Sequence, residues 1–409
     1  MERIYSIIDI GTSRVSTIIC SVEHKSYNIL GKGTCQCTGI TKGFITEPNK
    51  VIDSINTAVE QAEAMAGASI HSAYLNLKPL HIEVINKRCL IDIDSGDRKV
   101  TSADVKKLKE QLRHIELNQD WQLIDIIPRQ FILDNNEGIF DPVCMVGSRL
   151  AIDAYVICGY KNHINSIIKC LRSLDIELDG FIIEPLASAE SVFGNSTNEK
   201  GVIVINIDGN MTDIASFSGE KLVFCKSLPV GGDNIPKDLS ISLQIPISEA
   251  HRLKKQCNLA LKDMVQEDKE FIVTDSNDPT VKKSVYKSWV AEIIEARMSE
   301  IFTLSKDLIL DGDANMYDAA EILLTGRGIN DLYGCIELAG NVFGLPVRYV
   351  SFDDPSNPEY TQCIIMAKFL SSCPSDLWPS SNVEFFAQSS NKKKKGFVDR
   401  VISFLERFL

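Results

Sequence analysis

The chain has 409 residues, of which 44% are hydrophobic and 24% charged, and its formal net charge is −12. This length and apolar content allow a large core divided over two or three domains. The acidic balance argues against bulk attraction to nucleic acid, so we expect no nucleic-acid partner. The 12 cysteines include no CxxC pair and the 6 histidines show no metal-ligand spacing, which predicts reduced core thiols in a cytosolic protein. No apolar run approaches the ~18 residues of a membrane span, and no signal peptide precedes the first strand.

The first motif is the stretch IYSIIDIGTSRVSTII at residues 4–19. Its pattern predicts a buried strand, a tight turn at Gly11, Thr12 and Ser13, and a second strand. Because Gly11 lacks a Cβ, the backbone can come close to a ligand, and successive N–H groups in such a turn bind anions. Asp9, at the end of the strand, is placed to hold Mg²⁺ through water. An ordinary hairpin with an aspartate in its turn has the same pattern.

A second copy of this motif lies at residues 202–217, which read VIVINIDGNMTDIASF. Two such units predict a duplicated architecture with two phosphate-facing hairpins. The arrangement resembles the superfamily of actin, Hsp70 and the sugar kinases, in which the nucleotide lies between two lobes.

Longer stretches resemble one family within this superfamily. They are GITKGFITEPNKVIDSINTAVEQAEAMAG (39–67), IIPRQFILDNNEGIFDPVCMVGSRL (126–150), WVAEIIEARMSEIF (289–302) and the C-terminal tail. In this order they resemble the FtsA family of bacterial cell-division proteins, which are actin homologues. The resemblance implies an α/β, two-lobed actin-like (RNase H-like duplicated) ATPase fold with an FtsA-type subdomain insertion and a C-terminal amphipathic helix.

The expected division of the chain follows from the elements and the resemblance together. It comprises a first-lobe core (1–80 and 161–200), its inserted subdomain (81–160), a second-lobe core (201–225 and 305–370), a second-lobe insert (226–304), a linker (371–391) and a terminal helix (392–409).

Several helices are predicted along the chain, three of them from clear periodicity or capping signals in the protein body. One spans 53–66 and ends at Gly67, and another opens at Thr101, with Thr101 or Ser102 as its cap. The third is an amphipathic helix within the second-lobe insert. The residues with helical spacing there are Ile293, Ile294, Arg297, Ile301 and Leu304.

The resemblance implies an adenine-nucleotide site between the lobes, with ATP and Mg²⁺ as cofactors. The positions that match the family's nucleotide-binding pattern are Asp9, Gly11, Thr12, Ser13, Gly209, Thr212, Asp213, Gly231, Gly232, Lys254, Gly326, Arg327 and Gly328. Asp9 is also the expected metal residue. No catalytic residue is assigned.

The second phosphate loop departs from the family's pattern. Where the family has a sequence similar to DIGGGTMD, this chain has Asn206, Asp208 and Asn210 in place of an aspartate and two glycines. Two unit charges ~4 Å apart at an effective dielectric constant of ~20 repel by about 4 kcal/mol, so Asp208 opposes a γ-phosphate unless a cation lies between them. Arg327 stands where the family commonly has glycine, and its charge can face the phosphates. We therefore expect a nucleotide-binding protein that is at most a weak ATPase.

The C-terminal tail predicts a membrane contact. Residues 371–391 are rich in Ser and Pro and are typical of a linker. From Lys392 onward, six basic and two acidic side chains give a net charge of +4, against −12 for the whole chain. The apolar residues there fall in one sector of a helix, which favours a peripheral helix on an anionic membrane over a helix packed on the protein body. The expected membrane-binding residues are Lys392, Lys393, Lys394, Lys395, Phe397, Val401, Phe404, Leu405, Phe408 and Leu409.

The resemblance implies a membrane-tethering adaptor at the division site. Such a protein holds filaments of the tubulin homologue FtsZ at the cytoplasmic face of the cell membrane, recruits later division proteins and self-associates into filaments. The FtsZ C-terminal peptide is expected on the second-lobe insert, where Arg297 and Lys287 can meet an acidic peptide. An actin-fold small-molecule kinase remains an alternative, although the sequence shows no acidic substrate-base motif near the lobes. A pilus or shape assembly protein would lack the insert at 81–160, and a diverged paralogue without nucleotide control also stays open.

Overall fold

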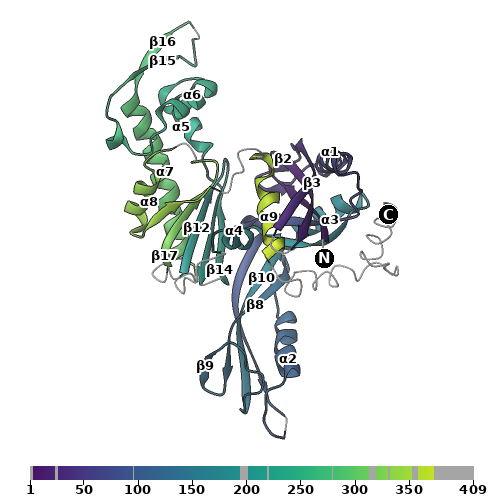
Figure 1. Ribbon diagram of the computed structural model, residues 1–409. Coiled ribbons are helices and arrows are strands. Elements are labelled where there is room, and N and C mark those ends of the chain that lie inside the picture. The colour runs from purple at the N-terminus through teal and green to yellow at the C-terminus, as the bar shows by residue number, and fades with distance from the viewer. Residues whose placement is uncertain are drawn as a thin grey trace.

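The computed structural model describes residues 3–23, 26–94, 96–193, 201–218, 221–278, 280–312, 319–329, 332–351 and 358–372. Within these residues the chain forms two lobes, each built on one mixed β-sheet, and a smaller subdomain projects from each lobe (Figure 1). The expected terminal helix at 392–409 and nearly all of the linker at 371–391 lie outside the described residues. Of the helices that are described, none is long and apolar enough to cross a membrane.

The first sheet begins with the strand, turn and strand that the motif at residues 4–19 predicts. The strands β1, β2 and β3 form an antiparallel meander, and β6 and then β11 continue the sheet in parallel on the other side of β1. The spatial order is therefore β11-β6-β1-β2-β3. The strands are β1 (Arg3–Ile10), β2 (Arg14–Glu23), β3 (Ser26–Gln36), β6 (Ser72–Leu77) and β11 (Glu177–Ile183).

The second sheet repeats this order and these strand directions. Its meander of β12, β13 and β14 is followed by β17 and β18, both parallel to β12, in the order β14-β13-β12-β17-β18. The strands are β12 (Gly201–Ile207), β13 (Thr212–Ser218), β14 (Lys221–Leu228), β17 (Ala319–Thr325) and β18 (Val347–Tyr349). The shared topology confirms the predicted duplication.

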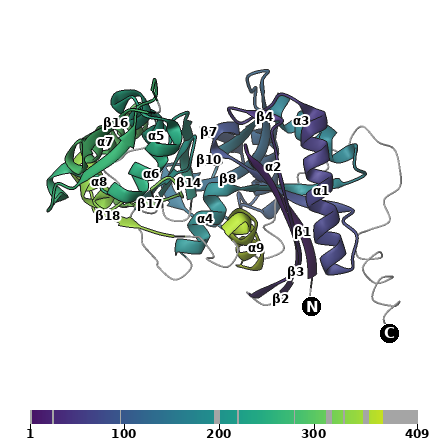
Figure 2. The ribbon, with the colours of Figure 1, turned by 90° about the horizontal axis from the view of Figure 1, so that it is seen from above.

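Helices cover both faces of the first sheet (Figure 2). Successive side chains of β1 point to opposite faces, so Ile8 packs in the cluster that contains α1 (Pro48–Ala66), and Ile7 packs in the cluster that contains α9 (Thr361–Ser372). Helix α1 starts before the predicted Asp53, because Pro48 fits the first turn, where an N–H is not needed. It ends as predicted at Gly67, whose φ is 66°.

The last described helix crosses back to the first lobe. The short 3₁₀ helix η4 (Pro358–Tyr360) leads into α9, and Ser16 Oγ donates a 2.7 Å hydrogen bond to the Glu359 carbonyl. Cys363 and Ile364 are buried against the first sheet. The prediction that all of 305–370 belongs to the second-lobe core is therefore wrong for residues 358–370, since their apolar side chains cover the first sheet.

The subdomain inserted in the first lobe is a small α+β unit. The chain leaves β6 through η1 (Pro79–His81), and it returns through α3 (Lys161–Arg172) and β11 to α4 (Glu184–Phe193). The strands form an antiparallel sheet in the order β7-β10-β8-β9. They are β7 (Ile82–Asp92), β8 (Trp121–Leu133), β9 (Asn136–Ile139) and β10 (Arg149–Tyr160).

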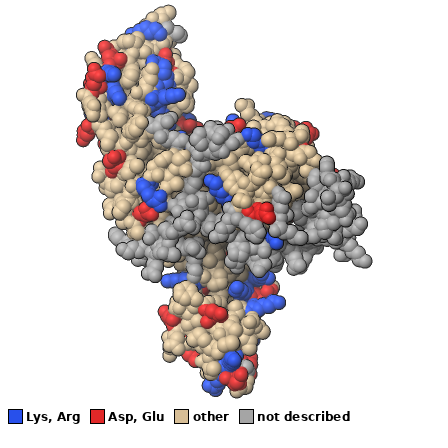
Figure 3. Space-filling view, in the orientation of Figure 1, with Lys and Arg blue, Asp and Glu red and all other residues tan. Residues whose placement is uncertain are grey.

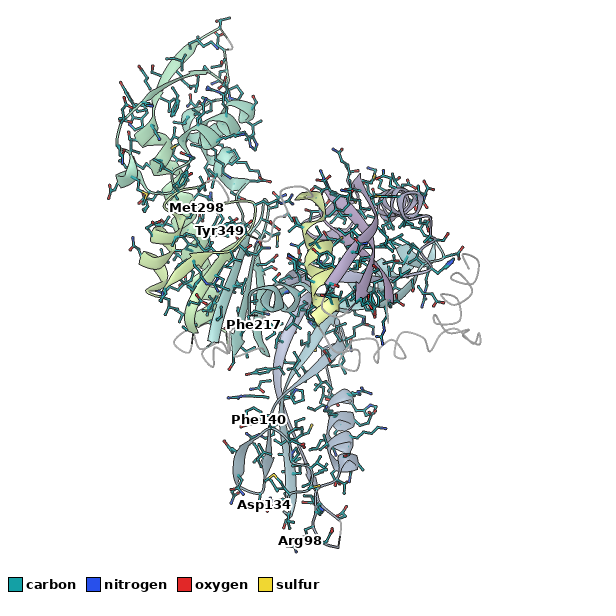
Figure 4. The ribbon with its side chains drawn as sticks, viewed as in Figure 1. Arg98, Asp134, Phe140, Phe217, Met298 and Tyr349 are labelled. Carbon is teal, nitrogen blue, oxygen red and sulfur yellow. The ribbon has the colours of Figure 1, made fainter. Side chains whose placement is uncertain are left out.

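Helix α2 (Ser102–Arg113) packs against this inserted sheet and begins at the predicted cap. Thr101 Oγ1 accepts a 3.4 Å hydrogen bond from the Asp104 N–H, and Asp104 Oδ2 accepts a 2.8 Å bond from the Thr101 N–H. Leu108 and Leu112 fill a core that belongs to the subdomain itself. Figure 4 places Arg98, Asp134 and Phe140 toward its far end, away from both lobes.

The second-lobe insert lies between β14 and β17. It consists of α5 (Asn234–Leu243), α6 (Ile247–Cys257), η2 (Lys262–Met264), β15 (Glu270–Thr274), β16 (Lys282–Tyr286) and most of α7 (Lys287–Leu310). Helix α7 buries Ile294, Met298, Ile301 and Phe302, but Leu304 is 40% exposed. The predicted apolar face is therefore wrong at Leu304. The predicted boundaries at 225/226 and 304/305 fall inside β14 and α7.

The remaining elements are α8 (Cys335–Phe343) in the second lobe and the hairpin of β4 (Ile40–Thr41) and β5 (Phe44–Ile45) in the first. One buried cluster contains residues of both lobes: Leu75 of the first sheet, Ile157 of the insert and Phe217 of the second sheet all belong to it. On the face shown in Figure 3, basic and acidic side chains are interspersed over both projecting subdomains.

Candidate nucleotide-binding cleft

A cavity of about 500 Å³ lies between the two lobes. It forms where the carboxyl ends of the parallel strands of the first sheet face those of the second, which is the edge at which ligands bind in such sheets. Asp9, Asn76 and Glu184 come from the ends of β1, β6 and β11, whereas Asp208 and Thr325 come from the ends of β12 and β17. The duplication therefore builds one site from two equivalent edges.

Amide side chains organise the carboxylates on the first-lobe side. Asn76 Nδ2 donates hydrogen bonds to Asp9 Oδ1 at 3.1 Å and to Glu184 Oε2 at 2.9 Å. Gln362 Nε2, from α9, donates to Glu184 Oε1 at 3.2 Å. The amide oxygens of Asn76 and Gln362 are buried and have no hydrogen-bond partner among the described residues. Because buried polar atoms are normally paired, these two acceptors are suited to a ligand or water in the cavity.

Glycines bring the second-lobe loops close together. The Asp208 N–H donates to the Met211 carbonyl at 3.0 Å and closes the turn between β12 and β13. Gly326 has a φ of +106°, and a Cβ there would lie 2.3 Å from the Ile207 carbonyl oxygen. The Gly328 N–H donates to that same carbonyl at 2.8 Å. The loop after β17 therefore packs on the second phosphate loop through backbone alone, which requires glycine.

The cavity is lined by all but three of the predicted nucleotide-binding residues. Those that line it are Asp9, Gly11, Thr12, Ser13, Gly209, Asp213, Lys254, Gly326, Arg327 and Gly328. Thr212 is fully buried and donates to the Val230 carbonyl at 2.8 Å. Gly231 and Gly232 lie behind the second loop, and the Gly232 N–H donates to the Asp208 carbonyl at 2.8 Å. These three residues shape the loop and do not face the cavity.

Lys254 connects the second-lobe insert to the cleft. It lies on α6, and its Nζ donates to the Gly328 carbonyl at 3.0 Å and the Gly232 carbonyl at 3.2 Å. The lysine therefore holds the two glycine turns together at the rim of the cavity.

Lys78, which belongs to none of the predicted motifs, is a lysine placed among the carboxylates of the cleft. It follows β6 and lines the cavity. Burial by itself lowers the pKa of Lys78, but the carboxylates around it outweigh this effect and raise that pKa above its ordinary value. Those carboxylates are Asp9 and Glu184 from the first lobe and Asp208 and Asp213 from the second. Lys78 therefore stays protonated and lies between acidic groups of both lobes.

One lysine does not balance these carboxylates completely. Burial raises the pKa of Glu184, and the charges of Asp213 and Asp9 raise it further against the opposing field of Lys78. Burial also raises the pKa of Asp213, although a hydrogen bond from Ser227 Oγ opposes the shift. Protons held by Glu184 and Asp213 therefore supply part of the compensation that Lys78 alone does not provide.

His81 and His163 line the cavity and form an aromatic cluster with Phe44. The rings of His81 and His163 stack with centroids 3.4 Å apart, and Phe44 meets the His81 ring edge-on at 5.1 Å. His81 Nε2 lies 3.0 Å from the Gly43 carbonyl oxygen, so this nitrogen carries the proton and donates. Burial lowers the pKa of His81 to about 4 and that of His163 to about 3, so both rings are uncharged at neutral pH.

A sequence signal for three of the missed residues did exist. Asn76, Lys78 and Glu184 lie at or just after the strands at 72–77 and 177–183. Once a duplicated parallel sheet is expected, residues at the carboxyl ends of its strands belong to the same edge. Gln362 has no such signal, because its position depends on α9 crossing to the first lobe.

The two cations predicted to meet a partner peptide lie outside the cleft. Arg297 Nη2 donates to Asp238 Oδ1 at 2.9 Å, and the guanidinium also pairs with Glu300. Its charge is therefore used in joining α7 to α5. Lys287 begins α7 next to Trp289, which is 49% exposed.

The cavity suits a nucleotide better than it suits a bare metal ion. Backbone at Gly209, Gly326 and Gly328 lines it, where N–H groups can approach a phosphate, and the two buried amide oxygens can accept hydrogen bonds from sugar hydroxyls or water. Carboxylate oxygens are ligands that Mg²⁺ prefers. However, within the described residues no group of three or more His, Cys, Asp and Glu side chains is arranged to hold a metal ion.

Solved structures with related architecture show the same fold. The PilM-PilN type IV pilus biogenesis complex matches with a TM-score of 0.58 at 13% identity, over 90% of this chain and 99% of that chain. MreB5 of Spiroplasma citri bound to ADP matches with a TM-score of 0.53 at 14% identity, over 90% and 97% of the two chains. These likenesses support the two-lobed actin-like fold that the sheets display.

Sequence comparisons identify the family. Family models described as "SHS2 domain inserted in FTSA" and "Cell division protein FtsA" match residues 80–158 and 203–364. The cell division protein FtsA of Bacillus subtilis (strain 168) is 30% identical over 371 residues, which are 90% of this chain and 83% of that protein. The FtsA proteins of Pseudomonas aeruginosa and Escherichia coli (strain K12) are 31% and 29% identical, each over 83% of this chain and over 81% and 82% of their own lengths. The chain therefore belongs to the FtsA family of bacterial cell-division proteins.

Proposed function

We propose that this protein is a cell-division adaptor that holds FtsZ filaments at the cytoplasmic face of the cell membrane and recruits later division proteins. The observation that carries the proposal is the SHS2-type subdomain between β6 and β11, which is added to a complete two-lobed body. It has its own core and projects away from the two lobes, so it is available for contacts with other proteins, including neighbouring copies in a filament. The identity with cell division proteins over most of the chain favours this interpretation over the pilus and kinase alternatives, because the fold alone is shared with a pilus complex.

The membrane contact is proposed for residues 392–409. Each Lys or Arg near an anionic surface contributes ~1 kcal/mol, and an amphipathic helix adds its buried apolar face. The full chain is expected to sediment with anionic vesicles and to stay in solution with neutral ones. A chain ending at residue 391 should stay in solution with both. Equal sedimentation of the full and shortened chains would refute the proposed anchor.

The partner contact is proposed for the exposed start of α7. The rings of Tyr286 and Trp289 meet at 5.2 Å, and Lys287 lies between them in sequence, so an acidic, partly apolar peptide fits this surface. Fluorescence anisotropy with a labelled FtsZ C-terminal peptide tests it. Lys287→Glu should weaken binding, whereas Lys106→Glu, an exposed change on α2, should not. Equal affinities of the two variants for the peptide would show that the start of α7 is not the contact surface.

The cleft is proposed to bind an adenine nucleotide with slow or no turnover. The Spiroplasma protein of the same fold is described as bound to ADP, and this cavity has glycine-lined loops on its second-lobe side. Phosphoryl transfer to water requires a positioned water and neutralised charge. The altered second loop, with Asp208 and Asn210, disfavours both. Saturable binding of a fluorescent ATP without steady phosphate release is the expected result, and sustained multiple turnover would contradict the second half of the proposal.

A further inference from the structure

The charges that line the cleft pose a problem for an anionic ligand. The acidic side chains are Asp9, Glu184, Asp208, Asp213, Asp233 and Glu359, and the basic ones are Arg14, Lys78, Lys254 and Arg327. Arg14 and Arg327 are exposed, and Lys254 is bonded to backbone carbonyls. A phosphate chain brought into this cavity needs a cation near the carboxylates, and Lys78 is the basic side chain in that position.

We propose that the Lys78 ammonium is the cation that this cleft supplies to the phosphates of a bound nucleotide, so that binding needs no divalent metal. The inference rests on the proposed nucleotide binding and specifies how that site compensates its own charge. It also explains Asp208, whose carboxylate alone would repel a phosphate. Lys78 and Asp208 come from opposite lobes and both line the cavity, and the charge of Asp208 acts on Lys78 across it.

The position of Lys78 follows from the sheet. It comes after the parallel strand β6, which lies between β1 and β11, so the lysine enters the cavity at the centre of the first-lobe edge. The carboxylates whose charges raise its pKa are Asp9 and Glu184 on its own lobe and Asp208 and Asp213 on the other. The ammonium can therefore attract carboxylates of both lobes and still face a ligand in the cavity between them.

The same geometry leaves few carboxylate oxygens available as ligands for a divalent ion. The Asn76 amide already donates to one oxygen of Asp9 and one of Glu184, which removes part of their capacity to bind a metal. The protonated Lys78 would also repel a divalent ion that used the remaining oxygens. Carboxylates whose oxygens already accept hydrogen bonds and that lie in the field of an ammonium are poor metal ligands.

Titration with fluorescent ATP in buffers containing MgCl₂ or EDTA tests the proposal on the full chain. The wild type is expected to bind with affinities that agree within about threefold. Lys78→Met should lose about tenfold or more in EDTA, because a charge-assisted hydrogen bond to phosphate is removed, and it should recover part of this loss in MgCl₂. The control is Lys255→Met, which removes an exposed lysine from α6 and should bind fluorescent ATP as the wild type does.

Asp208→Asn provides a second variant that does not depend on Lys78→Met folding. Removing this carboxylate should tighten binding in EDTA, both alone and combined with Lys78→Met. If wild-type affinity falls tenfold or more in EDTA, the Lys78 proposal is wrong and nucleotide binding still stands. Unchanged EDTA affinity in both Lys78→Met and Asp208→Asn would also overturn it. An absence of binding in both buffers would overturn the nucleotide proposal together with this one.

Discussion

Replacing His81 by phenylalanine should make the stability of the protein less sensitive to acid. His81 is 3% exposed and lies between the stacked ring of His163 and the edge of Phe44. Burial lowers its pKa from 6.5 to about 4. Between these two values the unfolded chain binds a proton that the folded chain does not, so stability falls as the pH falls.

The size of the effect follows from the two pKa values. The contribution of His81 to the free energy of unfolding is fully present above pH 6.5 and is lost toward pH 4. The total loss is about 3.4 kcal/mol, of which about 2 kcal/mol has occurred at pH 5. A phenyl ring can keep the contacts with His163 and Phe44. It loses the hydrogen bond to the Gly43 carbonyl, which costs about 1 kcal/mol at every pH.

Urea unfolding followed by tryptophan fluorescence at pH 7.5 and pH 5 measures this difference. Between pH 7.5 and pH 5, the free energy of unfolding of the wild type should fall by about 2 kcal/mol more than that of His81→Phe. The matched control is His251→Phe, which replaces an exposed histidine on α6 and should behave as the wild type. If His81→Phe and the wild type lose stability equally, the neutral buried state assigned to His81 is wrong.

Three further substitutions test the structural argument. Gly326→Ala forces a Cβ into a backbone with φ of +106°, so we expect about 1–3 kcal/mol of destabilisation and weaker binding of fluorescent ATP, whereas Gly96→Ala, with open space around it, should change neither. Thr101→Ala removes the cap of α2 and should cost about 1 kcal/mol, seen as faster hydrogen exchange confined to the inserted subdomain. Arg297→Met leaves Asp238 without its cation and should destabilise the second-lobe insert by about 1–3 kcal/mol, measured by its exchange rates or by denaturation.

Local patterns in the sequence were enough for the parts of the fold that depend on near neighbours. The strand, turn and strand at residues 4–19, the end of α1 at Gly67 and the cap at Thr101 each involve residues a few positions apart. The duplication was also visible, because the second copy at residues 202–217 repeats the same alternation of apolar strand and polar turn. The family assignment followed from the order of longer stretches, and the comparisons confirm it.

Contacts between residues that are distant in the chain were determined by the tertiary structure alone. Arg297 was expected to be available for a peptide, but it pairs with Asp238, and Leu304 was expected on the apolar face of α7, but it is exposed. Helical spacing says which residues share a face and does not say which helix covers that face. Residues 358–370 were assigned to the wrong lobe for the same reason, since an apolar helix does not specify which sheet it covers.

The functional site shows this division most clearly. From sequence alone, Asp9 and the glycine-containing turns were recognisable, because each belongs to a compact motif. Lys78, Glu184 and Gln362 entered the site only when the parallel strands aligned their carboxyl ends and α9 crossed between the lobes. The charge balance of the cleft depends on how far apart these groups lie in space, and that separation is set by the packing of the sheets, not by the order of residues along the chain.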